Sequence, residues 1–158
     1  MVRPPRGFPP GSVERDFEVV QEGWSEYEVH GGTVIMRGRI VLVRLFQLPD
    51  PRGQAFSAAT VPIFAVRAQR EEDLGEPENK PFDPSIDKTE PVDFQMRAQP
   101  WNVYRYRDGT KSYRLQIGLA VTGVSRVIGR FDHVGEPMYL AHHQALIGPP
   151  VPETPVDK

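Results

Sequence analysis

The sequence predicts an all-β fold in which two four-stranded units, related by an internal repeat, form a pseudo-twofold β-barrel or sandwich. Three observations predict it. Several segments alternate apolar and polar residues, as strands with one buried face do. Gly-Gly and Asp-Gly pairs separate some of these segments, as in tight hairpins. The phrase W-x-x-Y-x-x-x-x-G-T occurs at Trp24 and again at Trp101, 77 positions later.

The repeat extends beyond this phrase. In the same register, nine of the 27 positions from 16 to 42 are identical without a gap, among them Arg37 against Arg114. Two copies of this length do not make a solenoid, and each copy is too small to bury a good core alone. We therefore expect a fused pseudo-dimer whose halves share one core.

Composition divides the chain into five segments. Residues 1–13 form a proline-rich N-terminal arm, and residues 151–158 form a C-terminal tail of similar character. The two β repeats cover 14–69 and 91–150. Between them, residues 70–90 are rich in charge and proline, which predicts a linker or long surface loop with one helical turn at most. Both ends of the chain are expected to be extended.

Each copy is expected to contain four strands in the same order. The first starts near Phe17 or Phe94 and ends at a bend, Gly23 or Pro100. A second strand (24–30 or 101–107) leads through Gly31-Gly32 or Asp108-Gly109 into a long third strand (33–46 or 110–123), because such pairs suit two-residue hairpin loops. A turn of the form Asp-x-x-Gly precedes the last strand (56–66 or 138–147).

These turns predict a register and a core face. Glu26 is expected opposite Arg37, and Val103 opposite Arg114. One face of the two hairpins is apolar and is the expected core: Tyr27, Val29, Val34, Met36, Ile40 and Leu42, with Tyr104, Tyr106, Tyr113, Leu115, Ile117 and Leu119. Because 41, 43 and 45 are also apolar, each long strand is expected to enter a layer covered on both faces.

The opposite face carries the candidate partner- or ligand-binding residues, listed here: Trp24, Arg37, Arg39, Trp101, Arg105 and Arg114. Trp24 is expected beside Arg39, where a guanidinium can stack on the indole. Tryptophan and arginine suit a protein interface and, with less weight here, stacking on single-stranded nucleic acid. The structural alternative is that each tryptophan plugs a barrel end or the seam between the copies.

Charge patterning adds a second expectation for this face. Glu26 and Glu28 are expected to form cross-strand ion pairs with Arg37 and Arg39. The first hairpin is acidic where the second is basic. That complementarity could join the two halves, or it could join neighbouring molecules head to tail.

Catalytic chemistry has no support in the sequence. There is no cysteine, no Gly-x-Ser-x-Gly, no Ser-x-x-Lys and no phosphate-binding loop. His142 and His143 are neighbours on a predicted strand and point to opposite faces, so they are not expected to bind one metal ion together. We assign no catalytic residue, metal site or cofactor, and favour a non-enzymatic role.

Total charge and hydropathy limit the kinds of partner that the sequence predicts. The net charge of −2 and pI near 6.1 disfavour nucleic acid. No apolar run is long enough for a membrane span, and no secretory signal is recognised, so cytoplasmic residence is expected by default. The leading prediction is a non-catalytic protein-interaction or structural subunit of a larger assembly, with a protein partner or self-association. The alternative is a small-molecule or oligosaccharide-binding β-barrel, with its ligand near Trp101 and the tyrosines at 104, 106 and 113.

Overall fold

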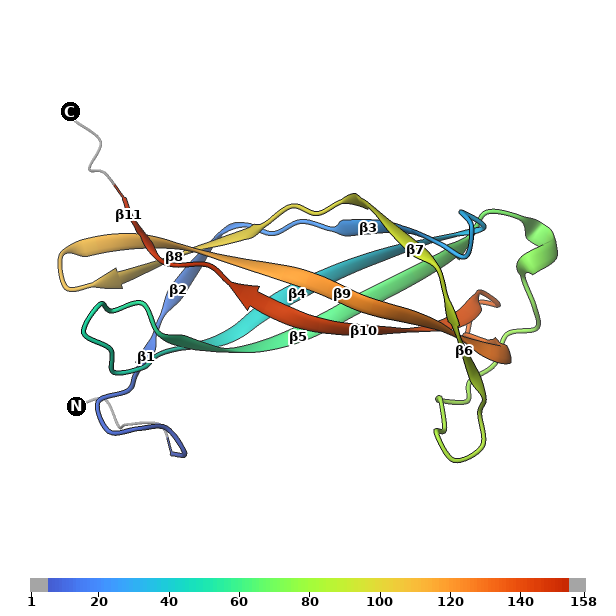
Figure 1. Cartoon of the computed structure of the whole chain (residues 1–158), viewed down its shortest axis with the longest axis horizontal. Helices are drawn as coiled ribbons and strands as arrows, with labels where there is room; N and C mark the ends of the chain where they lie inside the picture. Colours follow the sequence, from blue (N-terminus) through green and yellow to red (C-terminus); the bar gives the residue numbers. More distant parts are fainter. Residues whose placement is uncertain (1–5, 154–158) are drawn as a thin grey trace.

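The computed structural model describes residues 6–153, and over these residues the chain forms two antiparallel β-sheets and one short 3-10 helix, η1 (Glu71–Asp73) (Figure 1). Sheet A contains β1 (Val13–Arg15), β3 (Ser25–Val29), β4 (Val34–Gln47), β5 (Phe56–Ala68) and β7 (Phe94–Ala98). Sheet B contains β2 (Phe17–Gln21), β6 (Thr89–Val92), β8 (Asn102–Asp108), β9 (Lys111–Phe131), β10 (Pro137–Ile147) and β11 (Val151–Pro152). The all-β prediction is confirmed.

The eight expected strands correspond to β2–β5 and β7–β10. The largest difference is β9, which continues to Phe131 rather than ending near 123. Its added length pairs with β6, a strand that spans the end of the predicted linker and the start of the second predicted repeat. β1 pairs in the same way with the far end of β4, and β11 pairs with β9.

Neither sheet is built from one continuous stretch of chain. β2 lies in the first predicted repeat but pairs with β8 of the second, and β7 lies in the second but pairs with β3 of the first. Over the described residues the chain passes between the sheets five times, and the passages at residues 22–24 and 99–101 connect these exchanged strands to the two hairpins. These crossings interlock the two parts of the chain, so neither can detach without breaking both sheets.

The described strands do not close into a barrel. β5 is an edge of sheet A and β10 an edge of sheet B. The two edges approach each other, and the Phe64 and His143 rings are 5.4 Å apart. No ladder joins β5 to β10 among residues 6–153, so the architecture is two facing sheets.

The two hairpins differ in how well their register was predicted. In the first, Glu26 pairs with Arg37 as expected. In the second, Asp108 pairs with Lys111, so the loop is Gly109-Thr110 and not Asp108-Gly109. Val103 therefore lies opposite Gln116, and the expected pairing of Val103 with Arg114 is wrong.

The core lies between the sheets, and its expected face is confirmed. One cluster joins Ile40, Leu42 and Leu45 of β4 to Tyr104 and residues of β9. A second cluster, further along the strands, is built from β3, β4 and Val124. Of the twelve expected core residues, all are buried except Tyr113, which is half-buried.

The layer covered on both faces lies at 45–46 rather than at 41 and 43, because Leu45 and Phe46 are adjacent on β4 and both are buried. The register between β4 and β5 shifts between Leu42 and Arg44, as at a β-bulge. The extra residue, Val43, is 51% exposed, whereas Leu45 after the shift is fully buried. A bulge inserts one residue and so reverses which side chains face the core.

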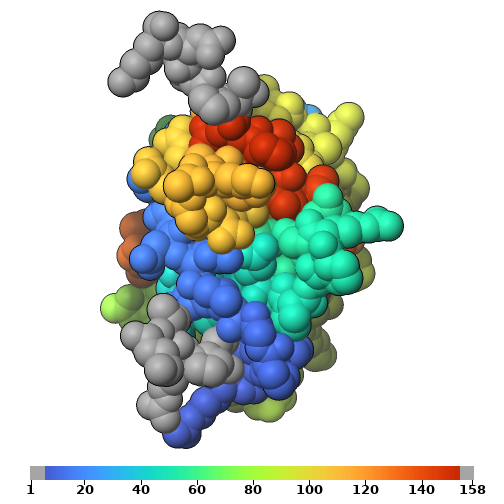
Figure 2. Space-filling model, turned by 90° about the vertical axis from the view of Figure 1, so that its left-hand side faces the viewer, coloured from blue at the N-terminus to red at the C-terminus, as the bar shows by residue number. Residues whose placement is uncertain are grey.

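The segments outside the expected strands contact the β body over their described residues. Phe8 stacks on Phe46 with ring centroids 4.6 Å apart. Arg130 of β9 holds the 70–90 segment by donating to Glu78 at 2.8 Å and to Asp87 at 2.6 Å. Viewed end-on, the N-terminal residues, the β4–β5 loop and the β8–β9 turn lie together at one end (Figure 2). The rest of the predicted arm and tail, 1–5 and 154–158, lies outside the described residues.

Candidate functional site

A buried polar network fixes the crossing that leads into Trp24. The Asn102 amide donates to the Ile40 carbonyl at 2.6 Å and accepts from the Gly23 N–H at 3.0 Å. The Glu22 carboxylate accepts from the Tyr104 hydroxyl at 2.7 Å. Burial, together with the Glu22 charge, raises the pKa of Tyr104. Because buried polar groups need partners, this network holds the chain at residues 22–24 in one conformation.

Trp24 lies under two arginines on the outer surface of sheet A. The guanidinium carbon of Arg37 is 4.9 Å from the indole centroid and that of Arg39 is 5.8 Å away. Arg39 also donates to Glu22 at 2.6 Å. The structure therefore brings together Trp24, Arg37 and Arg39, three of the six candidate residues.

The same outer surface is apolar beside this cluster. Val41 of β4 pairs with Val61 of β5, and Arg39 pairs with Ile63. Paired residues share a face, and core residues of β4 alternate with these, so all four point outward. Val61 is 49% exposed and Ile63 44%. We name this surface the A face and define it by Trp24, Arg37, Arg39, Val41, Val61 and Ile63.

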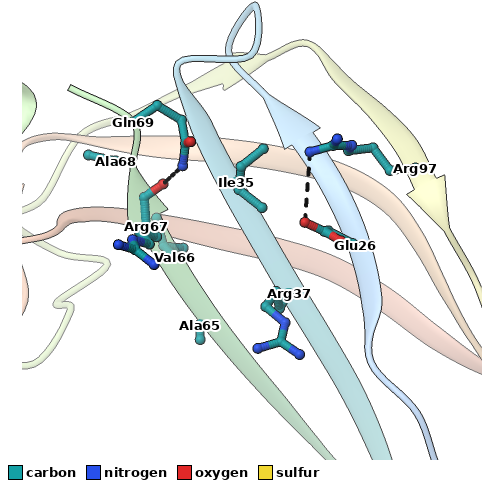
Figure 3. Close-up of a pocket in the computed structure, with 9 residues that line it drawn as sticks. All are labelled: Glu26, Ile35, Arg37, Ala65, Val66, Arg67, Ala68, Gln69 and Arg97. Carbon is teal, nitrogen blue, oxygen red and sulfur yellow. Dashed lines mark hydrogen bonds and ion pairs between the residues drawn. The ribbon is translucent and has the colours of Figure 1, made fainter.

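A shallow groove continues the A face toward the β3–β4 turn (Figure 3). It has a volume of about 510 Å³ and is lined by Glu26, Ile35, Arg37, Arg97 and residues 65–69. Among the described residues, no carboxylate forms an ion pair with Arg37 or Arg67. The groove can therefore accept acidic groups at its rim.

The ion pairs expected within the first hairpin are wrong. Glu26 and Glu28 lie 3.8 and 3.6 Å from Arg97 of β7, which pairs with β3 on the side away from β4. Arg37 stacks on Trp24 instead, and Arg39 takes Glu22. The acidic residues thus meet a basic residue of the second predicted repeat, although not one in its hairpin.

The other three candidates lie on sheet B. Trp101 is 39% exposed and covers Gly118, where a Cβ would stand 2.7 Å from the indole ring. Arg105 and Arg114 face each other directly across β8 and β9. Their partner is Glu153, which was not expected because it lies in the predicted tail. Tryptophan and arginines are therefore close on sheet A but serve separate contacts on sheet B.

The histidines and tyrosines lie at separate places in the described part of the fold. No cluster of three or more metal-ligating side chains occurs within residues 6–153. His30 contacts the Tyr139 hydroxyl at 3.1 Å, and His143 packs on Phe64, so these histidines lie apart. Tyr104 and Tyr106 are buried between the sheets, and burial raises the pKa of Tyr106 to about 12.

Sequence reasoning missed Val61 and Ile63 as surface residues. The available signal was a strand, residues 57–67, with apolar residues at both alternating positions. Such a strand is normally assigned to the interior. Here β5 is a sheet edge, and one of its two faces is open.

Comparison with protein-family models, with curated proteins and with solved structures finds no match to this chain. Within residues 6–153, the chain forms no helix of the length and hydropathy that a membrane span requires.

Proposed function

We propose that this protein is a non-catalytic interaction or structural subunit of a larger assembly, built on a duplicated β domain, and that it binds a protein partner through the A face. The single observation that carries the proposal is the pair Val61 and Ile63, each more than two-fifths exposed, beside Trp24. Apolar patches of this kind mark protein-binding surfaces.

The chemistry of the A face matches that of a protein interface. An antiparallel sheet packed on one side normally presents polar residues on the other. The centre of sheet A instead presents Val41, Val61 and Ile63, with Trp24, Arg37 and Arg39 at one end. Aromatic residues and arginine are enriched at the energetic centres of interfaces. Because the indole is already held by two guanidinium groups, little side-chain freedom is lost on binding.

Duplication is supported by the pattern of pairing. In each half a short first strand pairs with the end of the long strand, β1 with β4 and β6 with β9. The next strand of each half pairs in the other sheet. The second turns also agree: Gly53 donates to the Asp50 carbonyl and Gly135 to that of Asp132. A fusion of two exchanged units would account for these parallels.

A small-molecule barrel receives less support. The tyrosines proposed to surround a ligand pack on one another and on phenylalanines: Tyr104 contacts Phe17, and Tyr106 stacks on Tyr113 with centroids 5.2 Å apart. Tyr104 and Tyr106 are buried, and Tyr113 is half-buried.

A photo-crosslinking experiment tests the A face. A photoreactive amino acid would replace Val61 in the tagged protein, and a matched variant would carry it at Gln144 on the outer surface of sheet B. In native lysate, we expect the variant at position 61 to crosslink to one dominant protein. We expect the variant at position 144 not to crosslink to that protein. Equal adducts from both positions, or none from either in folded protein, would refute the proposal.

A further inference from the structure

A short C-terminal segment is seated on sheet B like a bound peptide. We call residues 148–153, Gly-Pro-Pro-Val-Pro-Glu, the strap. Val151 pairs with Arg114 and Pro152 with Tyr113, and the Glu153 N–H donates to the Ser112 carbonyl at 2.9 Å. The strap therefore adds a strand to β9 beyond the end of β10, which is the geometry by which sheet edges capture extended peptides.

The Glu153 carboxylate is held by four donors. One oxygen accepts from Arg105 Nε at 2.5 Å and Ser112 Oγ at 2.6 Å. The other accepts from Arg105 Nη2 at 3.1 Å and Arg114 Nε at 3.2 Å. The hydrogen bonds from Arg105 and Ser112 lower the pKa of Glu153 to about 2. Arg105 also lies 3.3 Å from Glu18 on its other side.

The site formed by Arg105, Ser112 and Arg114 requires an anion. Arg105 and Arg114 face each other directly, and like charges in such a pair destabilise a sheet unless a counter-charge lies between them. Two arginines and a hydroxyl around one carboxylate form a charge-assisted, partly bidentate site. Beside it, Pro150 and Pro152 border a pocket of about 200 Å³ that Tyr106 and Tyr113 also line.

The segment that joins the strap to β10 forms few backbone hydrogen bonds. Gly148 donates to the Gln116 carbonyl, but the next two residues, Pro149 and Pro150, have no N–H to donate. The ladder along β9 is therefore interrupted between Ile147 and Val151. In Figure 2 the red strap region lies at the surface, against the orange β8–β9 hairpin, so it can leave without disturbing the core.

We propose that Arg105, Ser112 and Arg114 form a receptor for the strap of a second copy of this chain, so that copies join by strap exchange. The contacts made in cis are available unchanged in trans, which is the basis of segment swapping. A tethered strap acts at an effective concentration on the order of millimolar. Exchange therefore prevails where copies are held close or where the cis contact is broken. This inference concerns sheet B and is independent of the A face.

Complementary variants test the exchange. An acceptor-only chain carries Glu153→Lys, which removes the strap's anion but leaves the receptor. A donor-only chain carries Arg105→Gln and Arg114→Gln, which removes the receptor but leaves the strap. We expect each to sediment as a monomer alone, and an equimolar mixture to form a 1:1 complex.

A monomeric mixture of chains with native circular dichroism would overturn the proposal. So would a complex that persists when the donor also carries Glu153→Lys, because that complex would not use the strap. If the double arginine variant fails to fold, Arg114→Gln alone serves as the donor-only chain, and the same outcomes apply.

Discussion

The hairpins β3–β4 and β8–β9 start from the same sequence phrase and share their inward faces, but their outward faces differ. In the first, Glu26 lies opposite Arg37, and both arginines of the face contact Trp24. In the second, Arg105 lies opposite Arg114, and their charge is met by a carboxylate from the strap. Inward positions keep the core, whereas outward positions are free to take different roles.

The two tryptophans show the same difference. Trp24 rests under guanidinium groups on the same face as the exposed Val61 and Ile63, so its surroundings suit a partner. Trp101 lies flat on Gly118 and covers its own sheet. Under the proposals above, sheet A binds a partner and sheet B makes contacts within the chain, and the following paired variants test this difference.

The largest expected difference lies at the start of each hairpin. Asn102 is buried and bonded to Ile40 and Gly23, while Ser25 occupies the corresponding position in the first hairpin. Asn102→Ala leaves buried partners unpaired, so we expect a loss of about 2–4 kcal/mol in the free energy of unfolding. For Ser25→Ala we expect less than about 1 kcal/mol. Urea unfolding measures both, and equal losses would contradict the asymmetry.

The next largest difference is expected between Gly118, which lies against the Trp101 ring, and the corresponding residue of the first hairpin. Gly118→Ala places a methyl group where the Trp101 ring lies, which should cost about 1–3 kcal/mol by overpacking and expose the indole. Val41, the counterpart position, already carries a side chain, and Val41→Ala should leave Trp24 in place. Emission from each tryptophan, with the other replaced by phenylalanine, checks this. An unshifted Trp101 spectrum in the Gly118 variant would show that the ring does not depend on this contact.

A smaller effect tests the hairpin loop. Gly109 has φ of +62° and is followed by Thr110, whose φ is not positive. Gly109→Ala should therefore cost about 1–2 kcal/mol, because the left-handed conformation is unfavourable for alanine. Thr110→Gly should cost about 0.5–1 kcal/mol through backbone entropy. A gain in stability from Thr110→Gly would instead indicate a positive φ at residue 110 and would contradict this loop.

The smallest effect is local and depends on pH. The pKa of Glu153 is lowered to about 2 by Arg105 and Ser112. Its contribution is therefore present above its ordinary pKa and is lost as pH falls toward 2. Amide exchange at Glu153, divided by the intrinsic rate at each pH, should accelerate through this acid range, and Glu153→Gln should remove the pH dependence. The same acceleration in the variant would assign it to another group, such as Asp87, whose pKa is also lowered.

The sequence predicted which residues face the core better than it predicted which residues pair across the strands. Moving the second loop by one residue shifts each cross-strand partner by two, so inward residues stay inward. The core at Tyr104 and Leu115 was therefore predicted correctly although the register was not. Gly109 serves as the first residue of its loop, as in a type II′ turn, and this reading competes with Asp-Gly in a type I′ turn.

Other features could not be predicted because they depend on long-range contacts. Alternation identifies β2 and β7 as strands, but nothing local shows that each pairs in the opposite sheet. The bulge at Val43 and the pairing of β6 with the end of β9 likewise depend on distant segments. Exposure of the A face follows from sheet A packing on sheet B through its other face, which is a property of the assembled fold.

Partner capture by two variants that each add one negative charge tests whether the A face binds a protein. Ile63 and Leu146 have similar exposures, 44% and 39%, on the outer surfaces of sheets A and B. The tagged wild type, Ile63→Glu and Leu146→Glu would each be used to capture proteins from native lysate, with quantification by mass spectrometry. We predict a stoichiometric partner that is retained by Leu146→Glu and reduced about 30-fold by Ile63→Glu, as for an interface hot spot of about 2 kcal/mol. A partner retained equally by both folded variants, or no stoichiometric partner for the wild type, would contradict the account.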